Sequence, residues 1–96
     1  MKLINIFVAR LNYKTTSDEL YELFTAFGDV KKAKIIIDAH TGFSKGYGFV
    51  LMSDEKEALY AIEQLHNSTF NKRKIIVKIA QEMNKTNQSK ENTILS

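Results

Sequence analysis

Aromatic, basic and small residues alternate in one short segment of this chain. Residues 45–52 read Lys-Gly-Tyr-Gly-Phe-Val-Leu-Met, and a strand there would place Lys45, Tyr47 and Phe49 on one face. Exposed aromatic rings can stack on other flat rings, and a lysine beside them supplies a positive charge. The same rings could instead pack in a core, and the alternation leaves both interpretations open. The two glycines on the opposite face favour exposed rings slightly, because they would let a helix approach the sheet closely there.

Six segments with regular apolar spacing would position these residues. The strand-like segments are rich in β-branched and aromatic residues, and the helical segments carry apolar residues at i, i+3, i+4 and i+7. Thr16 and Glu19 have the spacing of a capping box at the start of the first helix, and Gly28 would end it. Ser53 is expected to cap the second helix. The expected strands span residues 4–8, 33–37, 46–52 and 75–79, and the expected helices span residues 17–27 and 53–66.

The resulting order βαββαβ predicts an α+β fold, the ferredoxin-like sandwich in which a four-stranded antiparallel sheet carries two helices on one face. Two helices can cover only one face of such a sheet, so the other face is expected to be open to solvent. The domain is expected to span residues 1–80. Residues 81–96 are polar with isolated apolar residues, and we expect them to form a disordered tail.

The composition of the chain excludes several classes of protein. The chain has 96 residues, 44% of them hydrophobic, which suits one domain with an ordinary core. It has no cysteine, so disulfides, thiolate metal sites and cysteine nucleophiles are excluded, and a cytoplasmic location is expected. No segment approaches the roughly 20 apolar residues of a membrane span, and neither histidine has a neighbouring metal-ligand partner. We therefore expect no membrane association, metal or cofactor.

The net charge of +3 is small, but its distribution is uneven. Outside the two expected helices, the chain has thirteen basic residues and only four acidic ones. The helices hold one base, Lys56, and seven acids: Asp18, Glu19, Glu22, Asp54, Glu55, Glu57 and Glu63. Once the helices pack on one face of the sheet, the molecule would have an acidic side and a basic side. A basic face is typical of proteins that bind polyanions.

Two segments resemble motifs of a known family. Residues 45–52 fit the octapeptide ribonucleoprotein motif of RNA recognition motif domains, and residues 6–11, Ile-Phe-Val-Ala-Arg-Leu, fit their hexapeptide motif. Both lie on expected strands in the order that the family requires, and the resemblance covers about residues 4–80. The chain also resembles the small single-domain members of this family found in bacteria and cyanobacteria. The fold of the family agrees with the order of elements predicted above.

The resemblance implies that Phe7, Tyr47 and Phe49 point away from the core and stack on the bases of single-stranded RNA. Two positions depart from the motifs. Arg10 stands where the family usually has Asn, and Met52 replaces an aromatic residue and is expected in the core. Phe43, in the loop between the second and third strands, either covers an additional base or packs the loop. The expected RNA contacts are Phe7, Tyr47, Phe49, Lys45, Asn5, Arg10, Lys78, Ala80, Gln81 and Phe43.

The expected activity is single-stranded RNA binding by a monomer, with low to moderate sequence specificity, as in an RNA chaperone or a post-transcriptional regulator. Single-stranded DNA is an alternative ligand. A protein-interaction module on the same fold is another alternative, and Tyr21, Leu59 and Tyr60 lie off the apolar stripes of the helices, where they could dock a protein. A small enzyme of this fold, such as an acylphosphatase, would need a glycine-rich phosphate loop after the first strand. Residues 11–16 contain no glycine, so we expect no catalysis.

Overall fold

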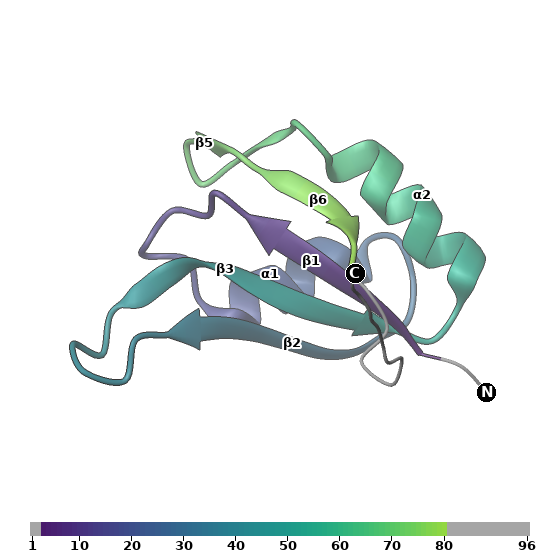
Figure 1. Ribbon diagram of the computed structural model, residues 1–96. Helices are drawn as coiled ribbons and strands as arrows, with labels where there is room; N and C mark the ends of the chain where they lie inside the picture. The colour runs from purple at the N-terminus through teal and green to yellow at the C-terminus, as the bar shows by residue number, and fades with distance from the viewer. Residues whose placement is uncertain (1–2, 81–96) are drawn as a thin grey trace, which may run out of the picture.

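The computed structural model describes residues 3–80 and has the predicted order of elements with one addition. The addition is a short hairpin, β4–β5, between the second helix and the last strand of the main sheet (Figure 1). The elements are β1 (Ile4–Ala9), α1 (Ser17–Thr25), β2 (Val30–Ile37), β3 (Ser44–Met52), α2 (Glu55–Leu65), β4 (Thr69–Phe70), β5 (Arg73–Lys74) and β6 (Ile76–Ile79).

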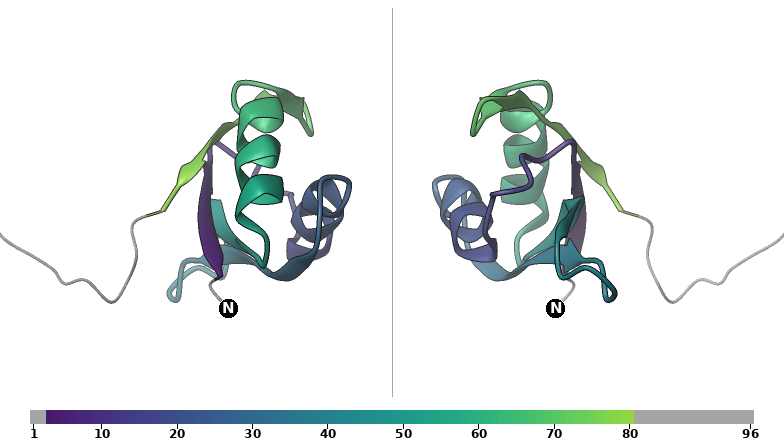
Figure 2. Two further views of the ribbon diagram at one scale, coloured as in Figure 1. Left: turned by 90° about the vertical axis from the view of Figure 1, so that its right-hand side faces the viewer. Right: turned by 90° about the vertical axis from the view of Figure 1, so that its left-hand side faces the viewer.

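Four strands form one antiparallel sheet in the order β2-β3-β1-β6. Figure 2 shows both helices on the same side of this sheet. The predicted ferredoxin-like sandwich is therefore confirmed, and within residues 3–80 no helix covers the other face of the sheet. None of the helices in this part of the chain is long and apolar enough to cross a membrane.

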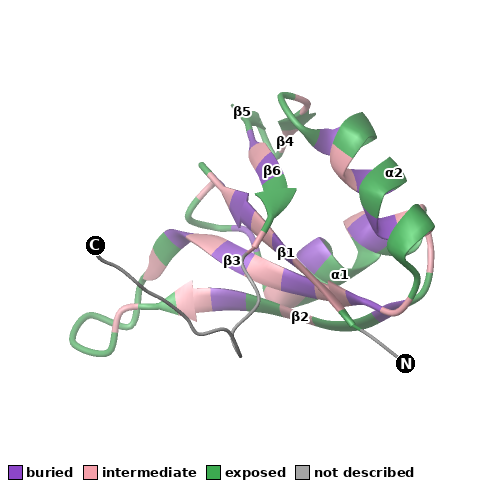
Figure 3. Ribbon diagram, turned by 45° about the vertical axis from the view of Figure 1, so that its right-hand side comes forward, coloured by how far each residue is buried: buried purple, intermediate pink, exposed green. Residues whose placement is uncertain are grey.

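The core lies between the sheet and the helices, and alternate residues of the strands fill it (Figure 3). Ile6 and Val8 of β1 are fully buried, and so are Val50 and Met52 of β3. The expected core position of Met52 is thus confirmed. Helix α1 contributes Phe24, the largest of the fully buried side chains. Because successive side chains of a strand point to opposite faces, the residues between these core positions face the open side of the sheet.

Helix α1 begins as predicted and ends earlier than predicted. The Thr16 hydroxyl oxygen accepts a hydrogen bond from the Glu19 backbone N–H at 3.1 Å, and the Glu19 carboxylate accepts one from the Thr16 backbone N–H at 3.1 Å. This reciprocal pair is the predicted capping box. The helix ends at Thr25 with Ala26 as its C-cap, so Gly28 lies beyond it.

The prediction that Ser53 caps the second helix was wrong. Asp54 is the N-cap of α2, and its carboxylate accepts a hydrogen bond from the Glu57 backbone N–H at 3.0 Å. The Ser53 hydroxyl instead donates to the Asp29 carboxylate at 2.9 Å. Asp29 also pairs with Lys31 at 3.0 Å, and the hydrogen bonds from Lys31 and then Ser53 hold the pKa of the Asp29 carboxyl below its ordinary value.

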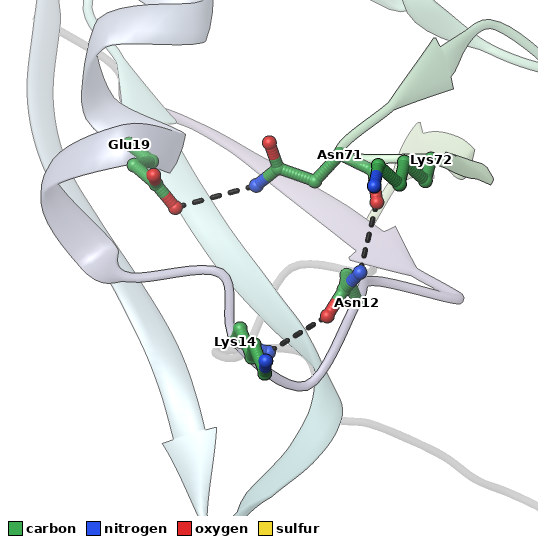
Figure 4. Close-up of a pocket in the computed structure, with 5 residues that line it drawn as sticks. All are labelled: Asn12, Lys14, Glu19, Asn71 and Lys72. Carbon is green, nitrogen blue, oxygen red and sulfur yellow. Dashed lines mark hydrogen bonds between the residues drawn. The ribbon is translucent and has the colours of Figure 1, made fainter.

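The hairpin β4–β5 turns through Asn71 and Lys72, which have φ values of +49° and +71°. Two left-handed residues in a two-residue connection are typical of a type I′ hairpin turn. The hairpin is tied to the loop between β1 and α1, because the Asn12 side-chain amide donates to the Asn71 carbonyl oxygen at 2.9 Å (Figure 4). In return, the Asn71 side-chain amide donates to the hydroxyl of Thr15 at 3.0 Å.

Candidate nucleic-acid interface

Three aromatic rings lie together on the open face of the sheet, and we call this cluster the aromatic platform. The centre of the Phe7 ring is 5.7 Å from that of Tyr47 and 5.5 Å from that of Phe49. The centres of Tyr47 and Phe49 are 6.5 Å apart. The ring planes are tilted by 46–89°, as is usual for aromatic pairs, so the rings support one another without stacking face to face. All three side chains are half-buried, which leaves part of each ring open to a ligand.

The strand register places a lysine at each end of a row across this face. Phe7 pairs with Phe49 on β3 and with Lys78 on β6. Phe49 pairs in turn with Lys34 on β2. The Lys78 ammonium nitrogen lies 5.9 Å from the centre of the Phe7 ring, within the range of a cation–π contact. A ligand lying along this row would meet two aromatic rings between two positive charges.

Gly46 and Gly48 of β3 were predicted to allow a helix to approach the sheet closely, but their close neighbours are different elements. A Cβ on Gly48 would collide with the backbone carbonyl oxygen of Lys34 on β2, and one on Gly46 would lie 3.1 Å from the Tyr13 ring. The close approach is therefore made by β2 and by the loop after β1 rather than by a helix, and that part of the prediction was wrong. The conclusion drawn from it holds, because Gly46 and Gly48 are buried while Tyr47 and Phe49 face the open side.

An apolar hollow of about 330 Å³ lies beside the platform. It is lined by Phe49 and Lys34 of the first row and by Asn5, Leu51 and Lys32 of the next row. Asn5 pairs with Leu51, which pairs with Lys32. The side-chain oxygen of Asn5 is buried and has no hydrogen-bond partner among the described residues. A buried carbonyl oxygen without a partner costs free energy, and a turn of the Asn5 side chain toward the hollow would relieve that cost.

Ala80, another expected contact, directly follows β6. The Ala80 backbone N–H donates to the Asn5 carbonyl oxygen at 2.9 Å, which places Ala80 beside Asn5 at the edge of the same face. Gln81 lies outside the described residues, as does the expected tail of residues 81–96.

The β2–β3 loop presents Phe43, whose side chain is 74% exposed. So high an exposure excludes the interpretation that this ring packs the loop. The loop is ordered by Asp38 instead, whose carboxylate accepts hydrogen bonds from the backbone N–H groups of His40 at 2.8 Å and Thr41 at 3.1 Å. The bonds from Thr41 and then His40 hold the pKa of the Asp38 carboxyl below its ordinary value, so the carboxylate stays charged to a lower pH.

Arg10 is exposed at the end of β1 and has a φ of +62°. The left-handed conformation costs most residues about 1–2 kcal/mol, whereas Asn adopts it more readily because its side chain can hydrogen-bond locally. This gives a physical reason for the Asn that the family usually has at this position.

Replacing Arg10 by Asn should therefore raise the free energy of unfolding by about 0.5–1 kcal/mol, part of the cost of the left-handed backbone. Urea denaturation of the two proteins measures the difference. Arg10→Gln is the matched control, because it also removes the charge but has no preference for this conformation. An equal gain from both substitutions would mean that the charge, and not the backbone, destabilises the folded state.

Tyr13 was not predicted as a site residue. It lies in the loop between β1 and α1, its side chain is 69% exposed, and it adjoins the end of β3 that carries Lys45 and Tyr47. An exposed tyrosine in a polar loop is an ordinary feature of a sequence. Its ring lies next to the platform because the loop is hydrogen-bonded to β3 through Leu11 and Gly46, residues that are far apart in the chain.

Both helices carry exposed apolar residues at the positions where protein docking was considered. Tyr21, Leu59 and Tyr60 are all exposed, and Tyr60 packs against Phe27 with ring centres 5.7 Å apart. Protein docking at these residues stays a prediction.

Comparisons with known proteins agree with the geometry of the sheet. The sequence pattern of the family described as RNA recognition motif matches residues 6–76. The U11/U12 small nuclear ribonucleoprotein 35 kDa protein of Bos taurus is 37% identical over 75 residues, which make up 78% of this chain and 31% of that protein. The chain therefore spans less than a third of that relative's length.

Two solved structures are similar over most of the chain. RNA binding protein PG1 matches with a TM-score of 0.80 and 46% identity, over 82% of this chain and 95% of that one. The Sxl-lethal protein/RNA complex matches with a TM-score of 0.78 and 33% identity, over 84% of this chain and 48% of that one. The match over residues 6–76 includes both ribonucleoprotein motifs on the two central strands, and it confirms the resemblance: this chain belongs to the RNA recognition motif family.

Proposed function

We propose that this domain binds single-stranded RNA by stacking bases on Phe7, Tyr47 and Phe49. The observation that carries the proposal is the aromatic platform, whose half-buried rings lie 5.5–6.5 Å apart on a sheet face that no helix of residues 3–80 covers. Each stacked base contributes roughly 1–3 kcal/mol with little dependence on its identity. As a member of a family of RNA-binding domains, the chain is a binding protein and not an enzyme.

The charges around the platform suit a phosphate backbone. Lys34 and Lys78 end the row through Phe7 and Phe49, and Lys32 adjoins the hollow beside it. Lys45 is exposed on the same face of β3 as Tyr47. Helices α1 and α2, on the opposite side of the sheet, carry six carboxylates and a single lysine. The uneven charge would orient an approaching polyanion toward the open face.

Polar groups at the edge of the platform supply a means of base recognition. Asn5 lines the hollow beside Phe49, where its side-chain amide would hydrogen-bond to a base that enters the hollow. Ala80, which follows β6, lies next to Asn5, and Gln81 is the next residue in the sequence. Arg10 would contact a phosphate, and the exposed ring of Phe43 would cover a base that extends past β2. The proposed RNA contacts are therefore Phe7, Tyr47, Phe49, Lys45, Asn5, Arg10, Lys78, Ala80, Gln81 and Phe43.

The test is a binding measurement with a mixed-sequence RNA of about ten nucleotides, in the size range that such surfaces hold. Fluorescence anisotropy should show binding of the single strand and little binding of the matched duplex, because a duplex hides its base faces. The logarithm of affinity should fall with the logarithm of salt concentration, with a slope of about −0.7 for each phosphate neutralised, or roughly −3 for four lysines. Equal affinity for duplex and single strand, or no dependence on salt, would contradict the proposal.

The proposal extends to sequence specificity, cellular role, oligomeric state and location. The stacking mode favours low to moderate sequence specificity, as expected for an RNA chaperone or a post-transcriptional regulator. A matched single-stranded DNA in the same measurement tests whether the 2′-hydroxyl contributes. The monomeric state and the cytoplasmic location, the latter expected from composition, are both proposals, and the bovine relative is by its name a small nuclear ribonucleoprotein. Sedimentation and localisation of a tagged chain would decide them.

A further inference from the structure

A small basic pocket lies just beyond the aromatic platform. Its volume is about 180 Å³, and its walls come from the end of β1, the loop after it, the start of β3 and the hairpin strand β5. Tyr47 belongs both to this pocket and to the platform, so the two surfaces are continuous. The residues that matter for its chemistry are Arg10, Tyr13, Lys45, Gly46, Tyr47 and Arg73.

The Tyr13 ring lies close to the β3 backbone although it is largely exposed. A Cβ added to Gly46 would lie 3.1 Å from Cε1 of Tyr13, so the ring edge rests against the β3 backbone. Gly46 has a φ of +84°, which a residue with a side chain would adopt only with strain. The Leu11 backbone N–H donates to the Gly46 carbonyl oxygen at 2.8 Å and fixes the loop to β3 at this point. The exposed part of the ring therefore faces solvent from a defined position.

Hydrogen bonds on both sides of Tyr13 keep the loop ordered. Asn12 donates from its side chain to the Asn71 carbonyl oxygen, and its side-chain oxygen accepts from the Lys14 backbone N–H at 2.9 Å (Figure 4). Asn71 in turn donates to the Glu19 carboxylate at 3.3 Å, which joins the hairpin to helix α1. A ring that is already ordered loses little conformational entropy when a ligand stacks on it.

The charged residues that line this pocket have one sign. Arg10, Lys45 and Arg73 line the pocket, and no carboxylate is among its lining residues. A guanidinium can both pair with a phosphate and lie over an aromatic face. An aromatic ring beside several cations complements a nucleotide, which has a flat base and a negative phosphate.

We infer that this pocket is an additional nucleotide subsite. A base stacks on Tyr13 there, and the phosphate of the same nucleotide is held by Arg10 and Arg73. The nucleotide is the neighbour, along the same strand, of the one that stacks on Tyr47. The inference rests on the proposed function and extends it, because the site then holds one nucleotide more than the sheet alone. The subsite also identifies the phosphate that Arg10 would contact, which is that of the nucleotide stacked on Tyr13.

The test compares four variants for binding to the mixed-sequence RNA of about ten nucleotides. Tyr13→Ala should weaken binding roughly 5- to 150-fold, the effect of losing one stacked base. Tyr13→Phe should bind within about twofold of the unsubstituted protein, because stacking needs the ring and not the hydroxyl. Tyr21→Ala, which removes an exposed tyrosine from helix α1, is the control for a nonspecific loss. Arg73→Gln should reduce the salt slope by about 0.7.

The outcomes separate this inference from the proposed function. If Phe7→Ala impairs binding while Tyr13→Ala binds like the unsubstituted protein, the pocket holds no nucleotide and the platform still binds RNA. If the unsubstituted protein does not bind the RNA, both proposals are wrong. If Tyr13→Ala lowers the melting temperature, Arg73→Gln decides the question, and an unchanged salt slope overturns the subsite.

Discussion

Replacing Phe7 by Ala should weaken single-stranded RNA binding by about 1–3 kcal/mol, or roughly 5- to 150-fold in dissociation constant. Phe7 is the central ring of the platform, since it contacts both Tyr47 and Phe49 and lies under the Lys78 ammonium group. The substitution removes a stacking surface and also a support of the two neighbouring rings. The side chain is half-buried on the open face, so the core stays intact and the melting temperature should change little.

Isothermal titration calorimetry gives the affinity, and circular dichroism gives the melting temperature. Phe49→Ala should behave similarly, but the double variant should lose less than the sum, because rings 5.5 Å apart share a contact. Phe7→Tyr keeps the ring and should keep most of the affinity. If Phe7→Ala unfolds the domain, or folds and binds RNA normally, the aromatic platform is not the binding surface.

The order of elements and the capping box at Thr16 were predictable because both depend on local spacing in the sequence. Apolar residues at period two or at i, i+3, i+4 and i+7 record which side of an element is buried. Thr16 and Glu19 are three residues apart, so their reciprocal hydrogen bonds could be read from the chain. The outward direction of Tyr47 and Phe49 needed the family motif as well, since alternation alone fits either face.

The features that were missed depend on contacts between distant residues. Ser53 and Asp54 are adjacent and both suit an N-cap, and the choice between them follows from the bond of Ser53 to Asp29, 24 residues away. The partner of Gly48 is the neighbouring strand β2, which the strand pattern alone does not identify. Tyr13 lies beside Tyr47 because its loop is bonded to β3, and no local signal in the loop indicates this.

The hairpin was missed for a different reason. Its turn residues, Asn71 and Lys72, both have positive φ, and the usual sequence signal for such a turn is Asn followed by Gly. This chain has Lys72 where that signal requires Gly, so the sequence does not indicate the turn. The side chain and carbonyl of Asn71 are hydrogen-bonded to the loop after β1, and these bonds help to hold the left-handed turn.

Replacing Phe24 by Ala should lower the stability of the fold, whereas the same change at Phe7 should lower RNA affinity and leave the fold stable. The Phe24 side chain is completely buried between α1 and the sheet, and truncating a buried phenylalanine costs about 3–5 kcal/mol in the free energy of unfolding. Natural domains are stable by only about 5–15 kcal/mol, and a domain of this size is expected near the lower end. The variant should therefore be unfolded or nearly so at physiological temperature, and it should bind RNA poorly for that reason alone.

Urea denaturation followed by circular dichroism measures this loss, and RNA binding is measured at a temperature where the variant is still folded. Under that condition its affinity should match that of the unsubstituted protein, because Phe24 and the aromatic platform lie on opposite faces of the sheet. Phe24→Leu retains most of the buried apolar volume and should be much less destabilising. A folded Phe24→Ala variant with normal stability and impaired RNA binding would mean that the helix side of the sheet contacts RNA, which would reverse the assignment of the two faces.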